Sequence, residues 1–453
     1  MPSRARVFVA PAYLLACLIL GGSAQGIWQN MFLQLVGVAI IAWAASQKEH
    51  PPVPRPATQL LVIAIFAITV VGLQLIPLPP AIWTHLGARQ KIAEGFLVLG
   101  VPVPDQPLSL APASGLSSLL AIIPPLALFC AMVRLKAYRP QLLAVALIAG
   151  TVAGIALGAM QVASSGGELS SLYLYNETNP GRAVGFFANA DHMASLLVVT
   201  IPFLAAIIAA GTSTSMQRYS AIVAVAIGLA IVVVVGLALN GSLAGYGLAL
   251  PVIAASTLVI LPPRSRLRSW IVGVTAILVL VSVTALETTS IGSGKLGEHA
   301  TNSVQSRAEI FATTAQAAGD FMPFGSGLGS FRSVYPLYER SDQVTTEYVV
   351  HAHNDYAEIA LELGVVGIIL ILLFLGWWTA AVWRAWRKPE GPFARAAAVA
   401  SAAVLVHSVV DFPLRTAAIS TCFAMCLALL ADSRAAPPKE KAQLRRSRHV
   451  EFK

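Results

Sequence analysis

About twelve hydrophobic stretches, each long enough to cross a bilayer, recur along the 453-residue chain and constrain its fold more than any other feature. A membrane-spanning helix needs roughly 20 apolar residues, because the hydrocarbon core offers no water to an unpaired backbone group. Only 11% of the residues are charged, whereas an ordinary soluble domain has about 25%. The sequence therefore predicts an all-α polytopic membrane protein and excludes a soluble enzyme, a disordered chain and a disulfide scaffold. We expect transmembrane helices at 7–25, 27–46, 59–78, 115–133, 141–162, 192–211, 220–239, 245–262, 270–287, 357–382, 396–412 and 416–432.

The positive charges divide unequally between the two sides of such a bundle. With the N-terminus inside and about twelve spans, 22 of the 30 Lys and Arg residues fall on the inner side and 8 on the outer side. Cytoplasmic loops carry this excess in membrane proteins, so we expect both termini to be cytoplasmic. The expected organisation is nine helices within 1–287, a large periplasmic loop at 288–356, three helices within 357–432 and a basic cytoplasmic tail at 433–453. Attraction to anionic membrane lipids accounts for the net charge of +9. The charge therefore does not indicate binding to nucleic acid.

Metal-binding and cofactor-binding motifs are absent from the sequence. The four cysteines, at 17, 130, 422 and 426, all lie inside expected spans, where cysteine is a small apolar packing residue. The chain contains no D-x-D pair, no H-E-x-x-H, no Walker loop and no G-x-S-x-G. We therefore expect neither a metal nor a cofactor.

The segment from 351 to 367, HAHNDYAEIALELGVVG, ends the large outer loop and continues into the tenth span. His351, His353 and Asn354 precede a helix whose first turns carry Glu358 and Glu362, four residues apart on one face. Helix capping and the helix dipole would explain the Asn and one Glu. They do not explain paired histidines beside a second, deeper Glu, and ionisable groups at such depth usually face a cavity. The segment is our main candidate for a functional site.

Two further polar groups adjoin expected spans. His407, Asp411 and Arg415 recur every four residues, so on an unbroken helix they would share one face, although a proline stands between Asp411 and Arg415. We favour a charge ladder within that helix over a catalytic role. Asp191 and His192 open the sixth span, either as a helix cap or as part of an outer cavity.

The run H-x-H-N-x-Y followed by E-x-G-x-x-G resembles the hallmark of the O-antigen ligase and O-antigen polymerase superfamily of bacterial inner-membrane proteins. Arg307 with the helix and glycine-rich turn that follow it, the R-x-x-G-x-x-x-N element that starts at Arg182, and the stretch from His407 are similar to further elements of this family. The resemblance covers roughly residues 180–430. It implies a helical glycosyltransferase fold of the GT-C-like type in the inner membrane.

The resemblance also implies a reaction, in which a glycan moves from an undecaprenyl-diphosphate carrier to an acceptor hydroxyl at the periplasmic face, on lipid A–core or a similar acceptor. Such a reaction needs cations against the diphosphate leaving group and a base for the hydroxyl. Arginine suits phosphate oxygens because its planar fork stays charged, so we expect Arg182 and Arg307 in that role. His353 is the expected base, since imidazole titrates near neutral pH.

The remaining polar residues are expected to assist. His351, Asn354, Glu358, Glu362 and Arg332 are candidate substrate-binding residues, and the two glutamates would tune the histidine or line a buried cavity.

One position departs from the family pattern. Members of the superfamily commonly carry a Ser-Arg pair after the seventh span, whereas this chain has Leu243 after Ser242. A phosphate-binding arginine would then come from elsewhere, such as Arg182 or Arg332.

Three functions remain open from the sequence: a ligase, which we favour slightly, a polysaccharide polymerase of the same superfamily, and a lipid-linked-glycan transporter or scaffold. The absence of a clear internal repeat and the gathering of polar residues at one face favour an enzyme over a transporter.

Overall fold

The computed structural model describes residues 5–24, 27–47, 52–165, 171–212, 214–262, 265–288, 295–341, 344, 348–387 and 391–432. Eight helices within these residues are long and apolar enough to cross a membrane, and four shorter apolar helices accompany them. Each of the twelve expected spans coincides with one of them, which confirms the all-α polytopic membrane fold. The tail at 433–453 lies outside the described residues.

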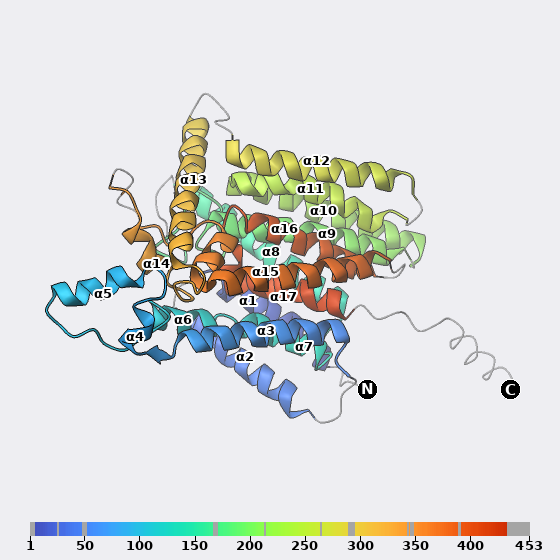
Figure 1. The fold of residues 1–453 in the computed structure, drawn as a ribbon. Helices are drawn as coiled ribbons and strands as arrows, with labels where there is room; N and C mark the ends of the chain where they lie inside the picture. The colour runs from blue at the N-terminus through green and yellow to red at the C-terminus, as the bar shows by residue number, and fades with distance from the viewer. Residues whose placement is uncertain are drawn as a thin grey trace.

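The helices of the bundle run roughly parallel to one another (Figure 1). They are α1 (Val9–Leu20), α2 (Trp28–Ser46), α3 (Arg55–Gln74), α6 (Pro112–Leu120), α7 (Ile123–Val133), α8 (Pro140–Ser165), α9 (Ala190–Gly211), α10 (Met216–Asn240), α11 (Leu243–Ile260), α12 (Leu267–Thr288), α15 (Asp355–Arg387), α16 (Pro392–His407) and α17 (Ala417–Ala431). The fourth span is made of two consecutive helices, α6 and α7, and a short 3₁₀ helix, η1 (Arg6–Phe8), leads into α1.

The outer loops fold at one end of this bundle, which we call the loop end. α13 (Lys295–Phe321) lies across the long helices there, and α4, α5 and α14 gather beside it (Figure 1). These elements are α4 (Pro80–Trp83), α5 (Arg89–Val98), α14 (Phe331–Val334) and the 3₁₀ helices η2 (Tyr335–Leu337) and η3 (Pro413–Arg415), with β1 (Pro77–Leu78) paired antiparallel to β2 (Gln106–Pro107). Among the described residues, these two short strands make up a two-stranded sheet.

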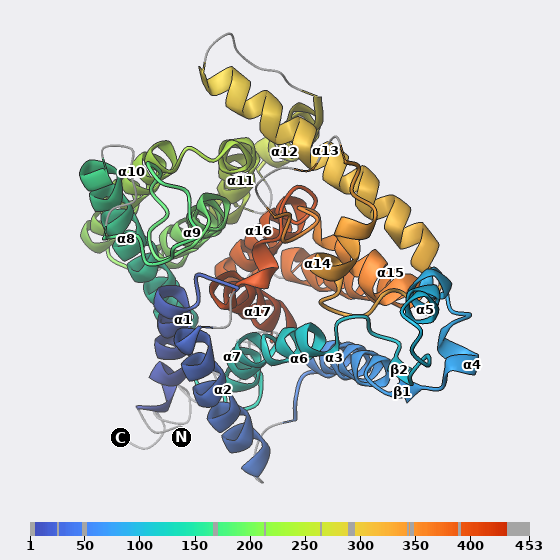
Figure 2. The same ribbon diagram turned by 90° about the vertical axis from the view of Figure 1, so that its left-hand side faces the viewer.

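The core is built around α16 and α17, which lie near the middle of the bundle when it is viewed from the loop end (Figure 2). α16 packs against α9, α11 and α17, and α17 packs against α1 and α7. Alanine supplies much of the buried surface of α16, so neighbouring helices approach closely, as small residues allow in membrane bundles. This packing brings the C-terminal end of α16 next to the N-terminal end of α9 at the loop end.

The eleventh span ends earlier than we expected. α16 stops at His407, residues 408–412 form turns, and η3 begins at Pro413. An unbroken helix from His407 to Arg415 is therefore wrong, because a proline in its interior would lack the N–H donor and clash with the preceding turn.

Candidate active site

Three histidines from separate parts of the chain surround the carboxylate of Asp411, which is fully buried. Nδ1 of His353 lies 3.2 Å from Oδ1. Nε2 of His192, in the first turn of α9, lies 3.8 Å from Oδ2, and Nε2 of His407, at the end of α16, lies 3.9 Å from the same oxygen. Three helix ends thus converge on one buried negative charge.

The contact with Asp411 fixes the orientation and the tautomer of His353. A carboxylate can only accept a hydrogen bond, so Nδ1 carries the hydrogen and the lone pair is on Nε2. The His353 backbone has a φ of 49°, in the left-handed region that few non-glycine residues adopt. Its side chain is 25% exposed, so Nε2 is on a ring that water and solutes can approach. An imidazole held in this way can accept a proton.

The electrostatics of Asp411 favour its ionised form. Burial alone would raise the pKa of this carboxyl, but the hydrogen bond from His353 and the neighbouring imidazoles of His192 and His407 hold the pKa well below its usual range. His407 is itself oriented, since its Nδ1 lies 2.7 Å from Oγ of Ser195. The lowered pKa favours the charged carboxylate, which can stabilise an imidazolium beside it.

The ring of Phe412 separates the histidines from one another. His351, His353 and His192 all contact it, at centroid distances of 4.4, 5.0 and 5.2 Å, the last two edge-on. Packing against one rigid ring restricts the rotamers of all three imidazoles.

Arg307 pairs with the acidic residue at the start of α9. Its Nη2 lies 2.8 Å from Oδ2 of Asp191, and Oγ of Ser242 donates to Oδ1 at 2.6 Å. Ser242 also caps α11 by accepting from the N–H of Gly245. The guanidinium, which is on α13, therefore lies beside the α10–α11 turn that carries Leu243, where the family pattern has its arginine.

Arg415 binds three carboxylates of α15. Its Nη2 lies 3.1 Å from Oε1 of Glu358 and 3.9 Å from Oε2 of Glu362, and its Nε lies 3.4 Å from Oδ1 of Asp355. Burial would lower the pKa of Arg415, but these carboxylates raise it above its ordinary value. Arg415 therefore joins α15 to the segment after α16 and does not extend a ladder within one helix.

The two glutamates also shape the chain before and beside α15. Glu358 accepts from the backbone N–H of Ala352 and lies 2.9 Å from Nδ1 of His351, and Glu362 accepts from the N–H of Phe331. Both side chains are buried, at 1% and 0% exposure. Their contacts hold the His-containing segment and α14 in place, which is a positioning role.

Asn354 caps α15. Its Oδ1 accepts from the N–H groups of Tyr356 and Ala357, both at 3.0 Å. The capping interpretation thus accounts for this amide oxygen, although a substrate contact by the rest of the side chain stays a prediction.

The glycine-rich turn from 323 to 330 docks onto a break in α15 at Gly364. The N–H groups of Ser326 and Gly327 donate to the carbonyls of Leu361 and Glu362, and Val365 donates to Pro323. Gly364 has a φ of 60°, and a Cβ there would lie 2.2 Å from the Pro323 carbonyl oxygen. Only glycine allows this approach.

Two side chains outside the expected site hold the same turn. Gln74, at the end of α3, donates to the carbonyls of Glu362 and Phe324 and accepts from the N–H of Leu328. Arg89 is fully buried and donates to the carbonyls of Gly325 and Leu108. Arg89 therefore has a structural role.

Arg182 and Arg332 are both exposed at the loop end. The chain after Arg182 is tied to α9, because Nδ2 of Asn240 donates to the carbonyls of both Ala183 and Ala190. Neither arginine makes a side-chain ion pair with a residue that the structure describes. The structure thus brings Arg307 and the histidine cluster together through α9, and it leaves Arg332 on the surface of α14.

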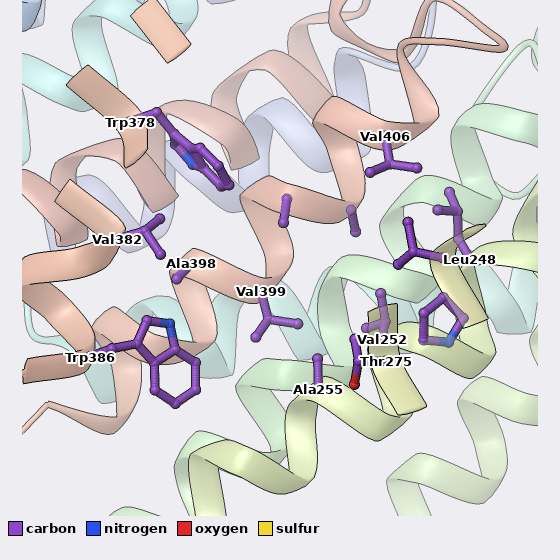
Figure 3. Close-up of a pocket in the computed structure, with 14 residues that line it drawn as sticks. Leu248, Val252, Ala255, Thr275, Trp378, Val382, Trp386, Ala398, Val399 and Val406 are labelled. Atoms are coloured by element: carbon purple, nitrogen blue, oxygen red, sulfur yellow. The ribbon is translucent and has the colours of Figure 1, made fainter. Parts of the chain in front are cut away.

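An apolar groove is lined by residues of α11, α12, α15 and α16 (Figure 3). Its volume is about 190 Å³. Val406, the neighbour of His407, lines one part of it, whereas Trp378 and Trp386 line the part along α15. Its lining is apolar apart from Thr275.

A protein-family model matches part of the chain. Residues 227–372 match the family model described as O-Antigen ligase. This match supports placing the chain in the O-antigen ligase and O-antigen polymerase superfamily. The matched segment, about a third of the chain, contains Arg307 and His353 but neither Asp411 nor His192. No curated protein matches the chain. The many apolar helices and this family match support a multi-pass inner-membrane protein.

The sequence interpretation gave Asp411, His407 and Arg415 a different role and placed His192 only in general terms. Their polar character inside or beside apolar spans was the available indication. Which helix ends meet depends on packing, which periodicity does not reveal. Among the described residues, no group of three His, Cys, Asp or Glu side chains is arranged to hold a metal ion.

Proposed function

We propose that this superfamily member transfers a glycan from a polyprenyl-diphosphate carrier to an acceptor hydroxyl at the periplasmic face, as an O-antigen ligase. Membership of the superfamily supports a ligase or polymerase type of function. The observation that carries the proposal further is the contact between His353 and the buried carboxylate of Asp411. A histidine oriented by an acid is the arrangement that general-base catalysis requires.

In the proposed step, Nε2 of His353 takes the proton of the acceptor hydroxyl while that oxygen attacks the anomeric carbon of the donor sugar. The bond between this carbon and the diphosphate oxygen breaks, and the carrier diphosphate leaves with the bonding electron pair. Asp411 stabilises the imidazolium that forms. The anion that departs is already stable, so the protein's main task is to orient the reactants and to balance the developing charge.

Arg307 is the proposed cation for the diphosphate. Its guanidinium has five N–H donors, and the Asp191 contact uses one nitrogen, so other donors remain for phosphate oxygens. Arg182, on the neighbouring loop, is the second proposed cation. Arg307 on α13 would then bind the diphosphate in place of the arginine that the family pattern has at the position of Leu243.

The apolar groove of Figure 3 supports a lipid carrier as the donor. A polyprenyl chain is a hydrocarbon, and Val406 places the groove one residue from His407 of the cluster. A carrier whose chain occupies the groove would present its diphosphate at the loop end.

Deletion of the gene, followed by complementation with wild type or His353→Ala at matched membrane levels, tests the proposal. We expect His353→Ala to abolish surface glycan and to let carrier-linked glycan accumulate, because a general base typically contributes about 10²–10⁴-fold to a rate. His85→Ala is the matched control, since His85 is an exposed histidine on the outer loops. Full rescue by His353→Ala would refute the assignment of His353 as the general base and favour a transporter or scaffold.

The same gel separates the two enzymatic possibilities. A missing ligase leaves long carrier-linked chains, because polymerisation continues without transfer to the acceptor. A missing polymerase leaves single repeat units on the carrier. Accumulation of single units would therefore indicate that the protein is a polysaccharide polymerase of the same superfamily and not a ligase.

A further inference from the structure

A second groove lies between α3 and α15, at the end of the bundle opposite the histidine cluster. α15 begins near the cluster at Asp355 and reaches Arg384 about eight turns later, and α3 has Arg55 at its far end and Gln74 at the loop end. The groove has a volume of about 690 Å³. Its lining combines the two arginines with polar Thr58 and apolar Val62.

The guanidinium of Arg384 lacks a counter-charge among the residues that the structure describes. Its Nε and Nη2 atoms are buried and lack an acceptor among the residues that the structure describes. A partly buried cation without a counter-charge is unfavourable, and an anion beside it restores the balance. Arg55, the first residue of α3, is exposed on the other helix that lines the groove.

The two helices are fastened together at this point. The indole Nε1 of Trp377 donates to the backbone carbonyl of Pro56 at 2.8 Å, and Trp377 itself is 7% exposed. This bond joins the first turn of α3 to α15 two turns before Arg384. The two arginines are thus presented by elements that the fold holds at a fixed separation, so the groove is pre-formed.

The lining changes from charged to apolar along α3. Val62 is 59% exposed and lies seven residues from Arg55, which is about 10 Å along a helix. Ile65, three residues further, is 62% exposed. A molecule that fits a groove with a charged end and an apolar end has an anionic head and a hydrocarbon chain.

We propose that this groove binds an anionic phospholipid, with Arg55 and Arg384 on its phosphate and one acyl chain along Val62. Basic pockets between transmembrane helices on the cytoplasmic side bind anionic head groups in this way. The site is separate from the proposed catalytic cluster. Its occupant would fasten α3 to α15, and through Gln74 of α3 it would steady the glycine-rich turn at the loop end.

Native mass spectrometry of the purified full-length protein tests the proposal, with added phosphatidylglycerol or phosphatidylcholine as the probe. We compare wild type, the double variant Arg55→Gln/Arg384→Gln, and Arg387→Gln. Arg387 is the matched control, because it is an exposed arginine of the same end of α15 that stacks on Trp383 and does not line the groove. A thermal unfolding midpoint measured for each variant shows that it is folded.

We expect wild type and Arg387→Gln to retain one phosphatidylglycerol with at least tenfold preference over phosphatidylcholine, and we expect the double variant to lose that preference. Equal retention of phosphatidylglycerol by the double variant and Arg387→Gln would overturn the site. Equal binding of both lipids by wild type would overturn the role of the arginines. If inorganic phosphate displaced the lipid completely, the ligand would be a free anion and the acyl-chain part of the proposal would be wrong. None of these outcomes depends on glycan transfer, so they leave the proposed catalytic function unaffected.

Discussion

Replacing Asp411 with asparagine removes the charge beside His353 and keeps the shape of the side chain. The asparagine oxygen can still accept from Nδ1, so the ring can stay in place, but the imidazolium formed during transfer loses its counter-charge. A hydrogen bond to a charged group contributes about 1.5–3 kcal/mol. Because the His353 side chain is 25% exposed and water screens part of the interaction, we take the lower part of this range, about 1.5–2.2 kcal/mol.

This free energy converts into a rate. At about 1.36 kcal/mol for each factor of ten, Asp411→Asn should lower kcat by roughly 10- to 40-fold, with little change in KM. The assay is transfer of a labelled glycan from a purified polyprenyl-diphosphate donor by the protein in nanodiscs. Ser408→Ala is the control, because Ser408 is buried in the same turn but donates to Asp355 instead of a histidine.

A double-mutant cycle tests whether Asp411 acts through His353. If it does, Asp411→Asn should change the residual rate of His353→Ala by less than about threefold, since residues that act as a unit are not additive. The reasoning would be refuted by an unchanged kcat in the single variant, or by the same 10- to 40-fold loss in both backgrounds.

Three further substitutions test other parts of the structure. Arg307→Gln should lower kcat/KM by about 100-fold through loss of a charge-assisted phosphate contact, measured in the same assay, whereas Lys91→Gln, at an exposed lysine of α5, should leave it within threefold. Arg415→Met should destabilise the protein by about 3–5 kcal/mol, because it leaves buried carboxylates without a cation, and a thermal midpoint equal to that of wild type would contradict this. Gly364→Ala should destabilise by about 1–3 kcal/mol through its positive φ, whereas Gly376→Ala on the same helix, where a Cβ meets nothing within 4 Å, should be neutral or stabilising by thermal denaturation.

The pH dependence of Asp411 has a defined sign. Its folded pKa lies below the usual range, so the stability it contributes is present above the unfolded pKa and is lost as the pH falls through the folded value. Acidification from pH 7 to pH 5 should therefore leave this carboxylate charged.

The twelve spans were predictable because hydrophobic length is a local property. Wherever the chain crosses a bilayer it needs about 20 apolar residues and a backbone whose hydrogen bonds are made within the segment. Each helix can therefore be recognised from its own stretch of sequence. The segment containing His353 and Glu358 could be found for a similar reason, since ionisable residues next to an apolar span are rare.

The partners of those residues could be known only from the tertiary structure. His407, Asp411 and Arg415 have a spacing that fits one helix, and only the end of α16 at His407 shows that the three side chains contact different elements. Gln74 and Glu362 are far apart in the chain, yet they meet across the same turn.

Periodicity specifies which face of a helix is apolar, but it does not say which helices become neighbours. In a membrane, lipid is as apolar as another helix, so the hydrophobic pattern alone gives little preference for one packing over another. Small residues on α16 and the break at Gly364 decide how closely the elements approach. The sequence therefore determined that the chain crosses the membrane and where its polar groups enter it. The packing decided that His353 would meet Asp411, because that contact depends on three helix ends arriving at one place.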